Sequence, residues 1–258
     1  MGQYCNAERD GHLLIVTINR PDVMNAMHPP ANREMSEVFD VFAADPDLWV
    51  AIVTGAGDRA FCAGNDLKYQ ATGGDMSAQP PTGFGGLTSR WDLHKPVIAA
   101  VNGVAMGGGF EIALACDIII AAENARFALP EVRVGLAALA GGLLRLPRTI
   151  GTKRAMGMIL TGRHVPAAEG YDLGFVTEVV PEGQALEAAK RWAAMMLEVS
   201  PMSVRASKQV VYESFEHGGV RAATEARYSE VMAMRSSEDF IEGPRAFAEK
   251  RPPQWKGR

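Results

Sequence analysis

The sequence predicts an α/β protein, built as a layered coil of repeated strand, strand and helix units and followed by a helical C-terminal region. Short runs rich in β-branched residues alternate with stretches of helical periodicity. Their spacing lacks the regular strand, helix, strand order of a doubly wound, dinucleotide-binding sheet. Beyond Gly183 helical patterns take over. At 258 residues, the chain is long enough to bury a substantial core.

Apolar runs closed by turn-forming residues predict the buried strands. These runs lie at residues 13–18, 50–54, 97–101 and 118–120. Helices are predicted where apolar side chains recur every three or four residues. Such segments cover about 31–44, 109–116, 185–199 and 201–215.

Residues 71–88, between two predicted strands, are dense in Gly, Pro, Thr and Ser. The segment is too long and too polar for a simple turn. Its composition fits a mobile flap over a binding site and fits a plain disordered loop equally well.

Composition and charge exclude several classes of protein. The content of 47% hydrophobic and 22% charged residues is ordinary for a globular chain. A net charge of −4, without a long basic stripe, gives no reason to expect nucleic-acid binding. No apolar run is long enough to span a membrane, and no secretory signal is visible. Three cysteines without CxxC spacing argue against a disulfide framework or a zinc site. We therefore expect a cytoplasmic protein that binds no nucleic acid, membrane or metal.

A glycine run and two glutamates are the best functional signal. Gly107–Gly109 opens a predicted helix and is followed by Glu111, and Glu131 comes 20 residues later. Consecutive glycines are costly in conformational entropy and mark close approach of a ligand, or of a packed helix, to the backbone. Two carboxylates there can exchange protons with a bound molecule, one ionised and one protonated. Both glutamates also fit the first turn of a helix, where the dipole favours them.

The sequence motifs of several other enzyme classes are absent. A GxGxxG fingerprint counted from Gly107 needs glycine at Ile112, and a P-loop counted from Gly103 needs lysine at Gly109. Neither a GxSxG elbow nor an HExxH pair occurs. Nucleotide-cofactor, serine-hydrolase and zinc-protease chemistry therefore have no support.

Taken together, the motifs resemble those of the crotonase (enoyl-CoA hydratase/isomerase) superfamily almost end to end. The matching segments are Asn19–Pro21, Asn25–Met27, Thr54–Gly57, Phe61–Lys68, Lys95–Gly103, Gly107–Glu111, Ala115–Asp117, Phe127–Glu131, Leu160–Arg163, Glu242–Gly243 and Lys250–Pro253. The resemblance implies a spiral core of repeated ββα units carrying an acyl-CoA site, over residues 1–195. It also implies a C-terminal helical oligomerisation region, over residues 196–258, that builds homotrimers, commonly paired into homohexamers.

The resemblance further implies an acyl-CoA substrate and no separate cofactor, since coenzyme A is part of the substrate. The backbone N–H groups of Asn65 and Gly108 would form an oxyanion hole for the thioester carbonyl, where one donor is worth roughly 3 kcal/mol. Glu111 would activate the water that attacks the β-carbon, and Glu131 would deliver the proton to the α-carbon. Substrate and CoA contacts are implied at Ala26, Ala63, Asn65, Asp66, Leu67, Lys68, Gly107 and Gly108.

Two departures from the family pattern bear on the acyl group. Asn65 replaces the usual alanine, so a polar side chain that can contact the substrate borders the pocket. Residues 135–145 lack the usual proline and the GGTQ-like sequence. Retention of both glutamates favours an enoyl-CoA hydratase acting on a 2-enoyl-CoA. An isomerase, a carnitinyl-type dehydratase, an acyl-CoA hydrolase or lyase, and a non-catalytic acyl-CoA-binding protein remain alternatives.

Overall fold

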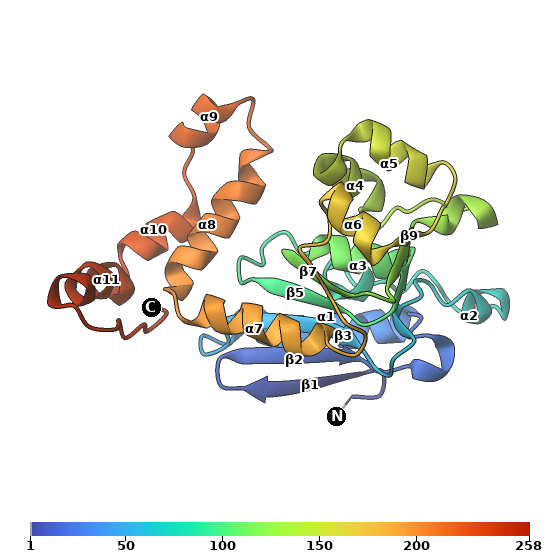
Figure 1. The fold of residues 1–258 in the computed structure, drawn as a ribbon, viewed down its shortest axis with the longest axis horizontal. Helices are drawn as coiled ribbons and strands as arrows, with labels where there is room; N and C mark the ends of the chain where they lie inside the picture. Colours follow the sequence, from blue (N-terminus) through green and yellow to red (C-terminus); the bar gives the residue numbers. More distant parts are fainter. Residues whose placement is uncertain (1) are drawn as a thin grey trace.

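Two β-sheets form the centre of the protein in the computed structural model, which describes residues 2–258 (Figure 1). The larger sheet has the order β1-β2-β3-β5-β7-β10, formed by Cys5–Asp10, Leu13–Ile18, Val50–Gly55, Val97–Val101, Ile118–Ala122 and Glu178–Val180. Only β1 runs antiparallel to its neighbour. The smaller sheet has the order β4-β6-β8-β9, formed by Ala60–Cys62, Val104–Met106, Arg126–Ala128 and Val165–Pro166. Its strands β4, β6 and β8 are parallel.

The chain alternates between the two sheets and so winds into a coil. Strands β3, β5 and β7 of the larger sheet are each followed by a strand of the smaller one, β4, β6 and β8. Helical segments then complete each turn: α2 (Leu67–Ala71), α3 (Gly108–Ala115), and η3 (Pro130–Val134) with α4 (Gly142–Ile150). This arrangement confirms the predicted spiral of ββα units.

The remaining helices surround the coil and extend from it. They are η1 (Pro21–Val23), α1 (Pro29–Ala44), η2 (Phe84–Gly86), α5 (Thr152–Ile159), α6 (Ala167–Leu173), α7 (Ala185–Leu197), α8 (Pro201–Ser214), α9 (Val220–Glu225), α10 (Ser229–Arg235) and α11 (Glu238–Glu249). Figure 1 shows α8 to α11 reaching away from the sheets as an arm. The predicted division at residue 195 falls inside α7 and stays a prediction. Within residues 2–258, none of the helices combines the length and hydropathy needed to cross a membrane.

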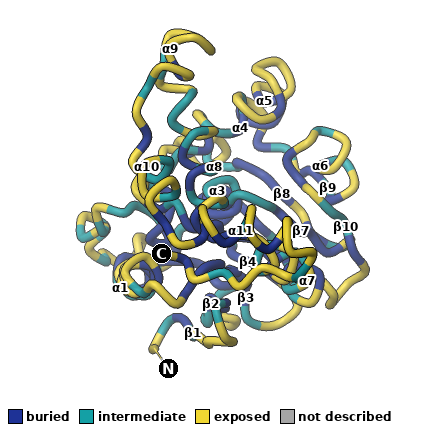
Figure 2. Tube along the Cα trace, turned by 90° about the vertical axis from the view of Figure 1, so that its left-hand side faces the viewer, coloured by how far each residue is buried: buried dark blue, intermediate teal, exposed yellow. Residues whose placement is uncertain are grey.

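Both faces of the larger sheet are covered, which explains its nearly continuous apolar strands. One face packs with α1 and α3 in a core that includes the rings of Phe39, Phe110 and Phe127. Against the other face lies α7, with Ala188 and Ala189 fully buried. Figure 2 shows the resulting band of buried strands beneath exposed helices such as α5 and α9.

Most of the predicted elements are present, with small shifts at their ends. Helix α1 begins at Pro29, two residues early, because the Nδ1 atom of His28 accepts a hydrogen bond from the Ala31 N–H at 3.2 Å and proline suits a first helical position. Strand β1 escaped prediction because it is polar and mostly exposed. The strands of the smaller sheet escaped because two or three residues carry no periodicity.

The segment 71–88 divides into two halves. Its first half is largely exposed, whereas Gly85, Gly86, Leu87 and Thr88 are buried. The second half is therefore packed into the core, and the expectation of a free flap or a disordered loop is wrong there.

Candidate active site

Successive turns of the coil bring the predicted site residues to one edge of the smaller sheet. In the parallel ladder of β4 and β6, Cys62 pairs with Ala105. Asn65 and Gly108 each follow these paired residues by three positions. The next strand, β8, continues the parallel ladder and leads directly to Glu131. Because parallel strands end at the same edge, residues from three separate segments converge there.

The two predicted oxyanion-hole amides lie side by side. Gly64 has a φ of +92°, and a Cβ atom on it would stand 3.1 Å from the Gly108 nitrogen and 2.6 Å from the Met106 oxygen. Only glycine allows so close an approach in this conformation. Within the described residues, neither the Asn65 N–H nor the Gly108 N–H donates a hydrogen bond. Two neighbouring donors are thus free for a ligand oxygen.

The side chain of Asn65 turns toward α2 instead of forming part of the hole. Its Nδ2 atom donates to the Gln70 Oε1 atom at 2.9 Å. The backbone around it is held by Met27, whose N–H donates to the Gly64 oxygen at 2.8 Å and whose oxygen accepts from the Asp66 N–H at 2.8 Å. Asparagine in place of the family's alanine therefore leaves the backbone N–H of residue 65 in position.

A buried ion pair fixes the loop after the oxyanion amide. Arg20 contacts the Asp66 Oδ2 atom at 2.9 Å, and both side chains are mostly buried. The Asp66 Oδ1 atom caps α2 by accepting from the Tyr69 N–H at 3.1 Å. Burial raises the pKa of Asp66, but the Tyr69 N–H and Arg20 outweigh it, so the net shift is downward. The carboxylate of Asp66 is engaged inside the protein, and so are its N–H and its carbonyl oxygen, so the expected substrate contact at Asp66 stays a prediction.

The other predicted contact residues lie on two neighbouring segments. Ala26 is buried beside the bridge that joins Met27 to Asn65. Ala63 is held there by a hydrogen bond from its N–H to the Met24 oxygen at 3.0 Å. Leu67 and Lys68 are exposed at the start of α2, where the lysine can meet an anionic group such as a CoA phosphate.

Glu111 is a buried carboxyl in the first turn of α3, with only 3% of its surface exposed. Its Oε1 atom accepts a hydrogen bond from the Gly142 N–H at 2.8 Å. Burial raises the pKa of Glu111 to about 7, the charge of Glu131 adds to the rise, and the Gly142 N–H opposes it. Near neutral pH this group therefore exists in both protonation states.

Glu131 stands on the other side of the glycine run, in the first turn of η3. A Cβ on Gly107 would lie 2.9 Å from its Oε1 atom, so the carboxyl reaches the start of α3. Its Oε2 atom is buried without a hydrogen-bond partner among the described residues. Burial raises the pKa of Glu131. A buried, unsatisfied carboxyl oxygen is costly and calls for a functional explanation.

These groups suit proton transfer beside a carbonyl. Two free N–H groups stabilise an oxygen that gains negative charge. Carboxyls with raised pKa values can accept and return protons at neutral pH. Over residues 2–258, no three His, Cys, Asp or Glu side chains are placed to share a metal ion. The expectation that no separate cofactor is needed stays a prediction.

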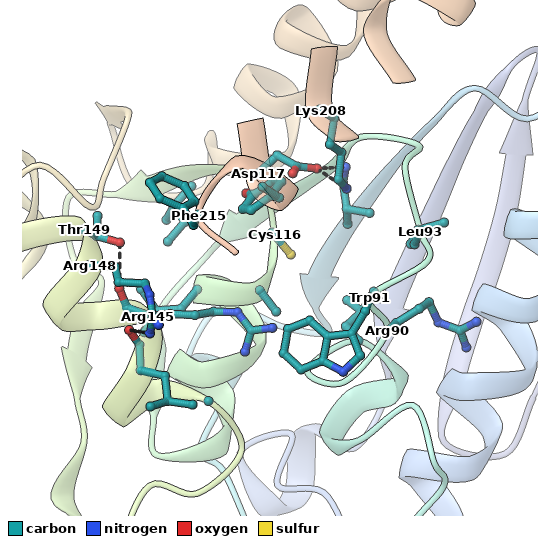
Figure 3. Close-up of a pocket in the computed structure, with 18 of the residues that line it drawn as sticks. Arg90, Trp91, Leu93, Cys116, Asp117, Arg145, Arg148, Thr149, Lys208 and Phe215 are labelled. Carbon is teal, nitrogen blue, oxygen red and sulfur yellow. Dashed lines mark hydrogen bonds and ion pairs between the residues drawn. The ribbon is translucent and has the colours of Figure 1, made fainter. Parts of the chain in front are cut away.

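A cavity of about 520 Å³ lies elsewhere, between α4, α8 and the C-terminal end of α3 (Figure 3). The Arg145 guanidinium sits 5.0 Å from the centre of the Trp91 ring, and Lys208 pairs with Asp117 at 2.8 Å. The cavity includes neither glutamate and neither oxyanion amide. The candidate active site is the sheet edge, because the donors and carboxyls converge there.

Three features of this site were missing from the sequence prediction. They are the support from Arg20, the hydrogen bond from Gly142, and the ring of Phe84, which packs on Gly108. Arg20 lies in a segment that resembles the family and Gly142 in a segment that departs from it. Neither segment has a local pattern that predicts the ion pair of Arg20 or the hydrogen bond from Gly142. No local pattern marks Phe84.

Comparison with known proteins identifies the family of the chain. The model of the enoyl-CoA hydratase/isomerase family matches residues 8–258. The carnitinyl-CoA dehydratases of Escherichia coli (strain K12) and Salmonella typhi are 43% and 42% identical to this chain over the full length of both proteins. The crystal structure of enoyl-CoA hydratase from Mycobacterium tuberculosis H37Rv covers the whole chain with a TM-score of 0.93 and 38% identity. That of carnitinyl-CoA hydratase from Mycobacterium avium also covers the whole chain, with a TM-score of 0.79 and 40% identity. The chain therefore belongs to the enoyl-CoA hydratase/isomerase family of the crotonase superfamily.

Proposed function

We propose that this protein is an enoyl-CoA hydratase that adds water across the 2,3 double bond of a 2-enoyl-CoA thioester. The proposal is carried by two free N–H groups, on Asn65 and Gly108, that lie near the buried carboxyl of Glu111 and the partly buried carboxyl of Glu131, both of raised pKa. The full-length relatives named as hydratases and dehydratases support the same hydro-lyase chemistry.

In the proposed reaction, the thioester oxygen accepts hydrogen bonds from the two amides. Ionised Glu111, held by Gly142, takes a proton from the attacking water as its oxygen bonds to the β-carbon. The electrons of the double bond move toward the thioester, and the amides stabilise the enolate-like charge. Protonated Glu131 then delivers its proton to the α-carbon, so one water has been added in total.

Dehydration of a 3-hydroxyacyl-CoA such as carnitinyl-CoA is the second candidate, favoured by relatives of that name at 42 to 43% identity. It uses the same groups in reverse. Incubation with enoyl-CoAs of increasing length, 3-hydroxyacyl-CoAs and carnitinyl-CoA, followed by mass spectrometry, separates the candidates. A product heavier by one water indicates hydration, one lighter by one water indicates dehydration, and free CoA indicates hydrolysis.

The variants Glu111→Gln and Glu131→Gln test the roles of the carboxyls. Each should lower kcat on the preferred substrate by at least about 100-fold, because general acid–base catalysis contributes that much. Glu225→Gln, at an exposed position on α9, is the matched control. Unchanged turnover in both site variants, with control and wild type active, contradicts the mechanism.

Self-association into trimers or hexamers belongs to the same proposal. The arm formed by α8 to α11 exposes Phe215, Phe240, Ile241 and Phe247. Exposed apolar groups on one projecting segment are typical of an interface. Light scattering on the 27.7 kDa chain should give three or six times that mass. A monomer at micromolar concentration would contradict it.

A further inference from the structure

We propose that Phe84 is a specificity-determining residue whose ring forms a fixed wall of the acyl site and limits the size of the acyl group. The inference rests on the proposed acyl-CoA site, but it concerns which acyl groups enter rather than which reaction follows. It is carried by two observations: where the ring lies, and how the turn that carries it is held.

The ring of Phe84 lies directly against the oxyanion residue. A Cβ atom on Gly108 would stand 2.5 to 2.8 Å from three of its ring carbons. A carbonyl oxygen bound to the Gly108 N–H lies about 2.9 Å from that nitrogen. The ring therefore borders the residue that would hold the thioester carbonyl, and in the proposed site it takes up space that a larger acyl group would need.

The turn that carries Phe84 has a backbone that glycine alone accommodates well. Gly83, Gly85 and Gly86 have φ values of +79°, +61° and +67°. A Cβ on Gly85 would collide with Ile112 of α3 at 2.5 Å, and one on Gly86 with the backbone of α1 at 2.6 Å. The turn is therefore wedged between two helices of the core.

Polar contacts hold the same turn on both sides. The Phe84 N–H donates to the Thr88 Oγ1 atom at 2.8 Å, and the Gly85 N–H donates to Asn32, a fully buried residue of α1, at 2.8 Å. The guanidinium of Arg90 then bonds the Gly86 oxygen at 2.8 Å. The backbone that carries the ring is held in this way, so loop movement cannot carry the ring aside as it would on a free flap.

Removing the ring should shift selectivity toward larger acyl groups. One methylene group more or less in an apolar pocket changes discrimination between substrates by about 10- to 200-fold. We expect Phe84→Ala to raise the affinity ratio of octanoyl-CoA or 2-methylbutyryl-CoA to butyryl-CoA by at least about 10-fold. Phe84→Leu should give a smaller shift, and Phe84→Trp should change the ratio in the opposite direction.

The experiment is calorimetric titration of wild type and these variants with saturated acyl-CoAs, which bind without reacting. Tyr171→Ala, a ring on α6 that is 57% exposed, is the matched control and should leave the ratio unchanged. Ratios within twofold of wild type in the folded Phe84 variants overturn the proposal. If Phe84→Ala does not fold, the Leu and Trp variants decide. Hydration of the matching enoyl-CoAs is assayed separately, so a protein that binds acyl-CoAs selectively but hydrates none contradicts the hydratase function alone.

Discussion

The buried carboxyl of Glu111 should make the stability of the fold depend on pH in a calculable way. Burial raises its pKa from an ordinary 4.5 to about 7 in the folded protein. Between these values the folded state keeps a proton that the unfolded chain has lost. The free energy of unfolding therefore falls as pH rises from about 4.5 through 7, and the contribution is fully present only below that range. At about 1.36 kcal/mol per pH unit, the interval corresponds to about 3 kcal/mol.

The variant Glu111→Gln isolates this contribution. Its side chain stays neutral at every pH and can still accept the hydrogen bond from Gly142. Urea unfolding of wild type and variant, at one protein concentration, should give a stability difference that moves by about 3 kcal/mol in favour of the variant between pH 4.5 and pH 8. Above pH 8 this stability difference should no longer change with pH.

The exposed substitution Glu225→Gln provides the reference for general effects of removing a carboxylate. The stability difference between Glu225→Gln and wild type should change by only a few tenths of a kcal/mol over the same pH range. If the stability difference between Glu111→Gln and wild type changes by less than about 1 kcal/mol from pH 4.5 to pH 8, the claim that ionising this carboxyl destabilises the folded protein is refuted.

Three further outcomes follow from the site. Gly64→Ala should lower kcat/KM on the preferred enoyl-CoA by about 100-fold in steady-state assays, because a Cβ 2.6 Å from a backbone oxygen displaces the oxyanion loop; a fully active variant would contradict the close contact. Asp66→Asn should lower the free energy of unfolding in urea by about 3 kcal/mol, because the mostly buried Arg20 loses its ionic partner; a loss below 1 kcal/mol would show that the pair is dispensable. The pH profile of kcat/KM should rise as Glu111 ionises near pH 7, and a flat profile from pH 5 to 9 would argue against its role as the base.

The coil and the glutamate pair were predictable because they leave local signals. The apolar run at 97–101 is a buried strand, and the glycine run before Glu111 opens a helix whose first turn holds that carboxyl. Both patterns arise within a few residues, so tertiary contacts were not needed to interpret them. The catalytic assignments needed the family resemblance, since a first-turn glutamate also has a purely structural explanation.

Contacts between distant segments explain what could not be predicted. Phe84 meets Gly108, and Gly142 meets Glu111, across more than 20 residues of chain. Neither contact has a period or a motif of its own. The loop containing Phe84 looked mobile from its composition, but Asn32 and the glycine conformations pack it against α1. Glycine and proline content describes backbone freedom before packing, and packing decides whether that freedom is kept.

The parallel register of β4 and β6 has a consequence for how this site can change over time. Because Asn65 and Gly108 follow paired residues by equal steps, their donors are main-chain groups placed by the backbone that leaves the two strands and not by any side chain. A side-chain substitution at position 65 leaves the peptide group where it is, as the asparagine illustrates. Loss of the donors would require proline or a change that moves the backbone, such as a Cβ on Gly64 or Gly108. The carboxyls and the acyl walls are side chains that mutation can exchange one at a time, so new substrates and reactions can arise while the oxyanion site is inherited with the fold.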